Sequence, residues 1–150
     1  MSWLRESPSY FRFYNSTIRL EEAPDGRVVG RKLNIDTGFF EPASSEDVHS
    51  VLSARADSDF SILSEEEFVK ETEDARRLYL RGEGSVFDIY RRIGEIFDGA
   101  RKQGRRIESA EKEEISSLRR RSFQLWEEES ARLTAGESPT FRRHGSNSRK

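Results

Sequence analysis

Residues 85–103 read SVFDIYRRIGEIFDGARKQ, and this stretch decides the fold that the sequence predicts. Its apolar residues recur every three or four positions, which places them on one stripe of an α-helix. The stripe is wide enough to face a core, and it consists of Val86, Phe87, Ile89, Tyr90, Ile93, Ile96, Phe97 and Ala100. The opposite face of the helix is charged. We therefore expect a central amphipathic helix against which the other elements pack.

A β-hairpin is predicted before this helix. Residues 10–20, YFRFYNSTIRL, and residues 27–35, RVVGRKLNI, are rich in the aromatic and β-branched residues that favour strands. The turn sequence APDG lies between them at 23–26. It is not a tight two-residue turn, so a loop of about four to six residues is expected. Gly30 interrupts the second strand and is interpreted as a β-bulge.

The remaining elements are helices. A short helix is predicted over 44–55, and a longer one over 64–80 begins with a serine and a glutamate spaced as in a capping box. A last helix is predicted over 109–133, and its apolar stripe is thin. The fold class is therefore α+β, with an N-terminal antiparallel β-hairpin or small sheet packed on three to four α-helices. We expect a single domain over residues 1–133 and a disordered polar and basic tail over 134–150.

The aromatic cluster at the N-terminus allows two interpretations. On a strand, Phe11 and Phe13 share one face, while Tyr10, Arg12 and Tyr14 share the other. Either helices cover both faces of the sheet, or the second face is a surface that stacks nucleobases or binds a protein.

The composition excludes several classes of protein. None of the 150 residues is cysteine, so disulfides, thiol nucleophiles and cysteine-bound metals are excluded. We find neither a signal peptide at the N-terminus nor an apolar run long enough to span a membrane. A soluble, cytoplasmic protein is the expectation.

Charge is unevenly distributed along the chain. Residues 41–74 contain eleven acidic and two basic residues, whereas residues 75–110 contain nine basic and five acidic residues. Either the two regions neutralise each other in the fold, or the acidic region attracts a partner. The second reading predicts a non-catalytic protein–protein interaction module of the inhibitor, immunity or adaptor/chaperone type. Its partner would be a protein, basic in charge, bound through Asp57, Asp59, Glu65, Glu66 and Glu67.

Arginine clusters support an alternative function. Arginine suits bidentate contact with phosphate, so the chain could instead be a nucleic-acid-associated protein. Glutamates interspersed among the arginines weaken the prediction of nucleic-acid binding. A separate hypothesis is that the chain self-associates through its last helix. The arginines concerned are Arg101, Arg105, Arg106, Arg119, Arg120 and Arg121.

Catalysis and metal binding are not expected. The calcium-loop-like start at Asp57 has Ile62 where a glycine is needed and Phe68 where a bidentate glutamate is needed. His49 and His144 are the only histidines, and neither belongs to a metal-binding pair. A small hydrolase built from His49 and carboxylates would require those groups to converge in one pocket. We predict no cofactor and no metal.

Overall fold

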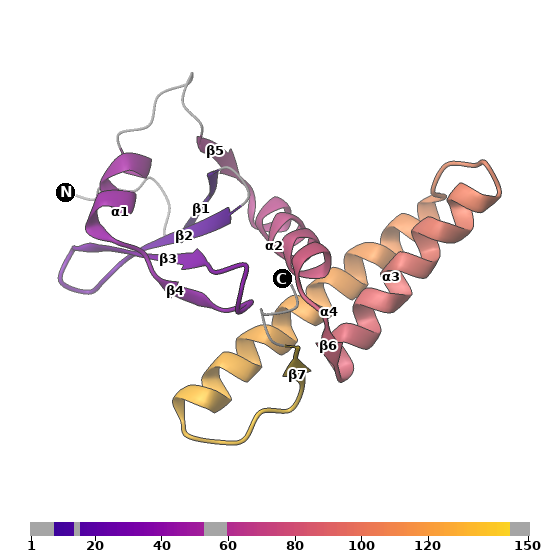
Figure 1. Ribbon diagram of the computed structural model, residues 1–150. Helices are drawn as coiled ribbons and strands as arrows, with labels where there is room; N and C mark the ends of the chain where they lie inside the picture. Colours follow the sequence, from indigo (N-terminus) through magenta and orange to yellow (C-terminus); the bar gives the residue numbers. More distant parts are fainter. Residues whose placement is uncertain (1–7, 14–15, 53–59, 145–150) are drawn as a thin grey trace. The chain divides into compact units, whose positions relative to one another are not determined.

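The computed structural model describes residues 8–13, 16–52 and 60–144 (Figure 1). The chain divides into two compact units, Met1–Ala75 and Arg76–Lys150, called here the sheet unit and the helical unit. The boundary falls within helix α2 (Glu65–Tyr79). Each unit has buried side chains of its own, and each is described by itself. The antiparallel sheet and the helices confirm the α+β class.

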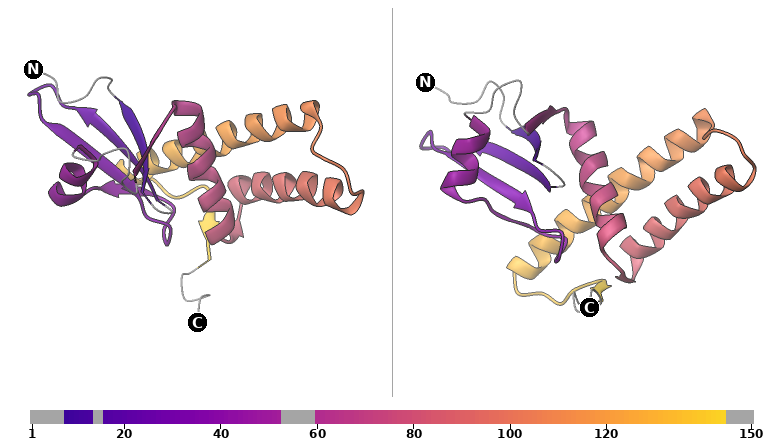
Figure 2. Two further views of the ribbon diagram at one scale, coloured as in Figure 1. Left: turned by 90° about the horizontal axis from the view of Figure 1, so that it is seen from above. Right: turned by 45° about the horizontal axis from the view of Figure 1, so that its top comes forward.

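The sheet unit is built on a five-stranded antiparallel sheet, whose strands lie side by side in Figure 2. The spatial order is β4-β3-β2-β1-β5, so β4 and β5 are the edge strands. The strands are β1 (Ser9–Phe13), β2 (Ser16–Glu22), β3 (Val28–Leu33), β4 (Phe40–Pro42) and β5 (Phe60–Leu63).

The stretch predicted as one strand over 10–20 is two strands. β1 and β2 pair antiparallel, with Ser9 opposite Leu20 and Phe13 opposite Ser16. The aromatic and β-branched residues on both sides of Asn15 favour strand so strongly that they hide the turn preference of this asparagine. The prediction of a single long strand is therefore wrong, although the predicted strand character is right.

The predicted hairpin is formed by β2 and β3, with residues 23–27 as its loop. Gly26 has a φ of 87° and donates its amide to the Ala23 carbonyl at 2.8 Å. The bulge at Gly30 is not present, because Gly30 pairs with Leu20 in a continuous ladder. A Cβ on Gly30 would lie 2.8 Å from Leu20 Cδ2 and 3.0 Å from Val48 Cγ2, so glycine allows close packing at this position.

Both faces of the sheet are packed. On one face, Val51 of helix α1 (Ser45–Leu52) joins Ile18 and Leu20 in a buried cluster, and Phe11 packs against it. On the other face, the first part of α2 contributes Phe68, which is 1% exposed. Its ring lies 4.6 Å from that of Tyr10.

Thr72 on the same helix lies 2.7 Å from Thr17 between their hydroxyl oxygens. Tyr10 and Phe11 thus contribute to packing on opposite faces of the sheet. Tyr14 and the side chain of Phe13 lie outside the part of the chain that the structure describes.

The helical unit contains an antiparallel pair, α3 (Ser85–Lys102) and α4 (Ser109–Thr134), visible in Figures 1 and 2. Both helices match their predicted spans to within one residue. The apolar stripe of α3 is buried as expected at Val86, Phe87, Tyr90, Ile93, Ile96 and Ala100.

The core of this unit is aromatic. Trp126 is 1% exposed and donates its indole N–H to the Tyr90 hydroxyl at 2.8 Å. The Phe141 ring packs edge-on against Trp126 at 4.8 Å between centroids, and the guanidinium of Arg76 lies 4.6 Å from the centroid of the Trp126 ring. These contacts join α2, α3, α4 and the segment after α4.

The described part of the predicted tail, residues 134–144, is folded, and Thr134 is the last residue of α4. Phe141 is buried, and the short strand β7 (Arg142–Arg143) pairs with β6 (Gly82–Glu83). The Glu129 carboxylate accepts hydrogen bonds from the Thr140 amide and hydroxyl. The expectation of disorder therefore does not hold for these residues, and residues 145–150 lie outside the described part. The prediction of one domain over 1–133 stays a prediction.

Candidate functional site

Three of the five acidic residues predicted to bind a partner form the first turn of α2. Glu65, Glu66 and Glu67, called here the acidic turn, are all exposed. Asp57 and Asp59 lie outside the residues that the structure describes. The acidic turn is therefore the part of the predicted surface that the structure describes.

The acidic turn begins with the predicted capping box. The Ser64 hydroxyl accepts the Glu67 amide at 3.1 Å, and the Glu67 carboxylate accepts the Ser64 amide at 2.8 Å. Such reciprocal bonds satisfy amides that have no partner inside the helix. Glu67 is thus committed to the helix start, which leaves Glu65 and Glu66 as the carboxylates available to a partner.

Glu65 and Glu66 make little contact with the rest of the sheet unit. The Tyr10 hydroxyl donates to Glu65 at 3.4 Å, which is a long bond. The pKa of Tyr10 is raised above its ordinary value. Partial burial is the larger cause, and the negative charge of Glu65 is the second. Glu66 has no hydrogen bond or ion pair with any residue in the described ranges.

Other carboxylates of the acidic region pair internally. Arg12 lies 3.1 Å from Glu71, and Lys70 lies 2.9 Å from Asp74. Such pairs contribute little stability at a surface, but each cancels a charge. Neither Arg12 nor Lys70 belongs to residues 75–110, so the mutual neutralisation of the acidic and basic regions stays a prediction. Glu65 and Glu66, like Glu46, are exposed carboxylates without an ion pair to a described residue.

The acidic turn directly follows an edge strand, β5, that was not predicted from the sequence. β5 ends at Leu63 and α2 begins at Glu65. β5 pairs with β1 and is last in the strand order. Ile62 of β5 is 83% exposed, the largest value among the exposed large hydrophobic residues in the described ranges. The edge strand β5 thus places the exposed Ile62 within a few residues of the carboxylates of the acidic turn.

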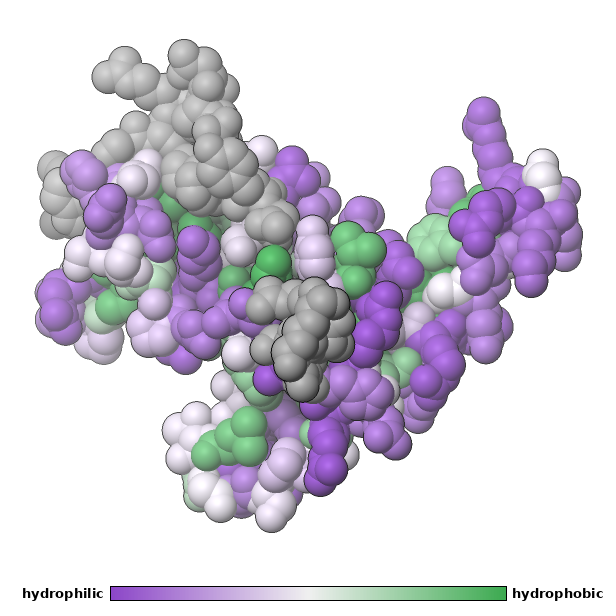
Figure 3. Space-filling view, in the orientation of Figure 1, coloured by the Kyte–Doolittle hydropathy of each residue, from purple (hydrophilic) through white to green (hydrophobic). Residues whose placement is uncertain are grey.

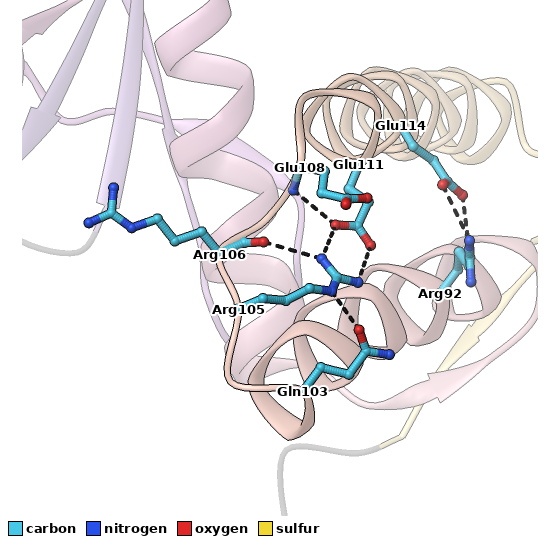
Figure 4. Close-up of polar contacts among 7 residues, drawn as sticks. All are labelled: Arg92, Gln103, Arg105, Arg106, Glu108, Glu111 and Glu114. Atoms are coloured by element: carbon cyan, nitrogen blue, oxygen red, sulfur yellow. Dashed lines mark hydrogen bonds and ion pairs between the residues drawn. The ribbon is translucent and has the colours of Figure 1, made fainter.

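At the tip of the helical hairpin, arginines of the predicted nucleic-acid-binding surface form ion pairs with neighbouring carboxylates (Figure 4). Arg105 donates to both carboxylate oxygens of Glu111, at 2.7 and 3.0 Å, and to Gln103 at 2.6 Å. Glu111 also accepts the Glu108 amide at 2.9 Å, which completes a capping box at the start of α4. Arg105 therefore closes the turn between the helices and is not available as a phosphate ligand.

A second bidentate pair, from Arg92 of α3 to Glu114 of α4, lies beside this cluster at 2.9 and 3.2 Å. Arg101 pairs with Asp98. Arg106 points away from the cluster in Figure 4, and its side chain has no ion pair within the described ranges. Figure 3 shows a largely hydrophilic surface over the hairpin.

The two predicted arginine groups are separated along the helix. Arg119 is ten positions beyond Ser109, the first residue of α4, which corresponds to about 15 Å of helix rise. Arg120 and Arg121 are exposed on α4 and form no ion pair with a described residue. The structure thus places the predicted arginines at two locations and commits Arg101 and Arg105 to carboxylates.

The Arg105–Glu111 pair predicts a pH dependence of stability. Hydrogen bonding from Arg105 lowers the pKa of Glu111 from 4.5 to about 2. Because the folded-state pKa is depressed, the pair stabilises the fold above pH 4.5, and this contribution is lost as the pH falls towards 2. Arg105→Gln should lower the melting temperature at pH 7, and the difference from wild type should shrink across this window. An equal difference at pH 7 and pH 2.5 would contradict the assignment.

Within the described residues, no three histidine, aspartate or glutamate side chains are grouped so as to hold a metal ion. A polar hollow of about 320 Å³ in the sheet unit is lined by residues that include Lys32, Glu41 and Asp47. His49 is exposed and does not line it. Among all the residues that the structure describes, no helix is both long and apolar enough to span a membrane.

Comparisons with known proteins assign no relative. The chain matches no family model, and no curated protein or solved structure was found to be similar to it.

Proposed function

We propose that this chain is a non-catalytic protein-binding module that attracts a basic partner through the acidic turn of α2. The observation that carries the proposal is the exposure of Glu65 and Glu66, which are not committed to strong ion pairs. Neighbouring carboxylates at Glu71 and Asp74 are neutralised by Arg12 and Lys70. An inhibitor, immunity or adaptor role would use such a surface.

Electrostatics explains why this surface is suited to a partner. Unpaired carboxylates raise the rate at which a positively charged protein associates, and their effect falls with salt. The arginine alternative is less favoured, because the arginines are spread over two locations and two of them are paired. Phosphate binding by Arg106, Arg120 and Arg121 is kept as an outcome of the test.

Charge reversal tests the proposal. Glu65→Lys with Glu66→Lys should abolish most of the salt-sensitive capture of a partner, because attraction becomes repulsion. Glu67 is left unchanged, since it caps the helix. The measurement is a pull-down from native lysate with the wild-type and variant chains, at low and high salt, with and without nuclease.

The matched control reverses two exposed glutamates on α4, Glu113→Lys with Glu128→Lys, for the same change in net charge. The proposal predicts that this control captures the same protein as wild type. Equal capture by both variants would contradict it. A partner lost after nuclease, and lost again when Arg106, Arg120 and Arg121 become alanine, would favour nucleic acid instead.

A further inference from the structure

The two edges of the sheet differ in how they are protected. Natural proteins block sheet edges with charged residues, proline, bulges or covering elements, because unpaired backbone groups recruit other strands. The edge strand β4 contains Glu41 and Pro42, and both features discourage strand addition. The edge strand β5 reads FSIL and contains neither a charge nor a proline. Among the described residues, β5 pairs with β1 alone.

The exposed side chain on β5 adds a second feature. Ile62 lies opposite Phe11 of β1 and is 83% exposed. An incoming strand beside β5 would place its alternate side chains next to Ile62, because every second residue shares a face. Backbone hydrogen bonding and apolar contact would therefore be available at the same edge.

We propose that an extended, basic segment of another protein adds to β5 as a further strand of the sheet, with an apolar side chain packed on Ile62. The basic character of the segment rests on the proposed function of the acidic turn. Backbone bonding to β5 provides affinity, as in other cases of β-strand addition, and the side chains provide selectivity. Glu65 and Glu66, immediately after β5, attract the basic side chains of the segment.

The negative charge around β5 favours another protein, and not a second copy of this chain, as the strand that adds to this edge. Residues 56–67, ADSDFSILSEEE, contain five acidic residues and no basic residue. Two copies joined through this edge would bring like charges together, which is unfavourable. A segment with lysine or arginine at alternate positions would instead be complementary in charge and in pattern.

The test uses a synthetic peptide of alternating lysine and valine, labelled with fluorescein, and the full chain. Binding is measured by fluorescence anisotropy at low salt. A second peptide of the same sequence carries methyl groups on alternate backbone amides, which removes donors without changing the charge. The proposal predicts that the methylated peptide and the Ile62→Ala variant each bind at least about tenfold more weakly. Because Ile62 is largely exposed, this variant is expected to fold, which circular dichroism checks.

The controls separate this proposal from the proposed function. If both peptides bind equally and only Glu65→Lys with Glu66→Lys abolishes binding, the acidic surface stands and strand addition is wrong. If methylation and Ile62→Ala weaken binding while charge reversal does not, strand addition stands and the acidic surface is wrong. Failure of the unmodified peptide to bind at millimolar concentration would overturn strand addition by a basic segment. A concentration-dependent dimer lost in Ile62→Ala would assign the edge to a second copy.

Discussion

Trp126→Ala is expected to lower the free energy of unfolding of the helical unit by about 3–5 kcal/mol, the range for a large aromatic residue removed from a core. Trp126 is 1% exposed and packs edge-on against Phe87 and Phe141. Its removal leaves a cavity and deprives the Tyr90 hydroxyl of a donor. Urea unfolding followed by far-UV circular dichroism measures the loss.

A conservative variant separates packing from hydrogen bonding at this position. Trp126→Phe keeps most of the apolar volume and removes the indole donor, so a smaller loss of about 1–2 kcal/mol is expected. Tyr90→Phe removes the acceptor and should cost about 1 kcal/mol. If Trp126→Ala changes stability by no more than Trp126→Phe does, the aromatic core is not organised around this side chain.

Glu129→Ala is expected to cost about 2–3 kcal/mol and to release the segment that contains Phe141. The Glu129 side chain is buried, and its carboxylate accepts the Thr140 amide at 3.0 Å and the Thr140 hydroxyl at 2.6 Å. Removing the carboxylate takes away the acceptor of both Thr140 donors and leaves a cavity where the side chain was buried. Faster amide hydrogen exchange at residues 140–143 measures the release directly, and urea unfolding measures the loss of stability.

Thr140→Val provides the control, because it removes only the hydroxyl bond and should cost about 1 kcal/mol. Exchange at residues 140–143 should then stay slow. Glu129→Ala with unchanged exchange at these residues would show that the carboxylate does not hold the segment.

The helices could be predicted from the sequence because their signals are local. The apolar repeat of α3 and the Ser64–Glu67 capping box depend on residues three or four positions apart. Phe141 could not be recognised as a core residue, because a single aromatic residue in a polar segment has no period. Glu129 is likewise a charged residue whose burial depends on a segment eleven residues further along the chain.

The candidate site was only partly predictable for the same reason. Exposure of Glu65 and Glu66 follows from their place in a helix start, and both were predicted from the sequence to bind a partner. Neutralisation of Glu71 by Arg12 joins residues far apart in the chain, and no local pattern reveals it. The edge strand β5 is four residues long and follows a polar stretch, so it lacks the length that identifies a strand.

Amide hydrogen exchange of the full chain, with and without the alternating lysine–valine peptide, tests the binding surface most directly. We predict that exchange slows at β5 and the acidic turn, residues 60–67, and is unchanged over residues 91–121. This pattern should disappear at high salt and in the Glu65→Lys, Glu66→Lys variant. Slowing confined to residues 91–121, or absent throughout the chain, would contradict the assignment of partner binding to β5 and the acidic turn.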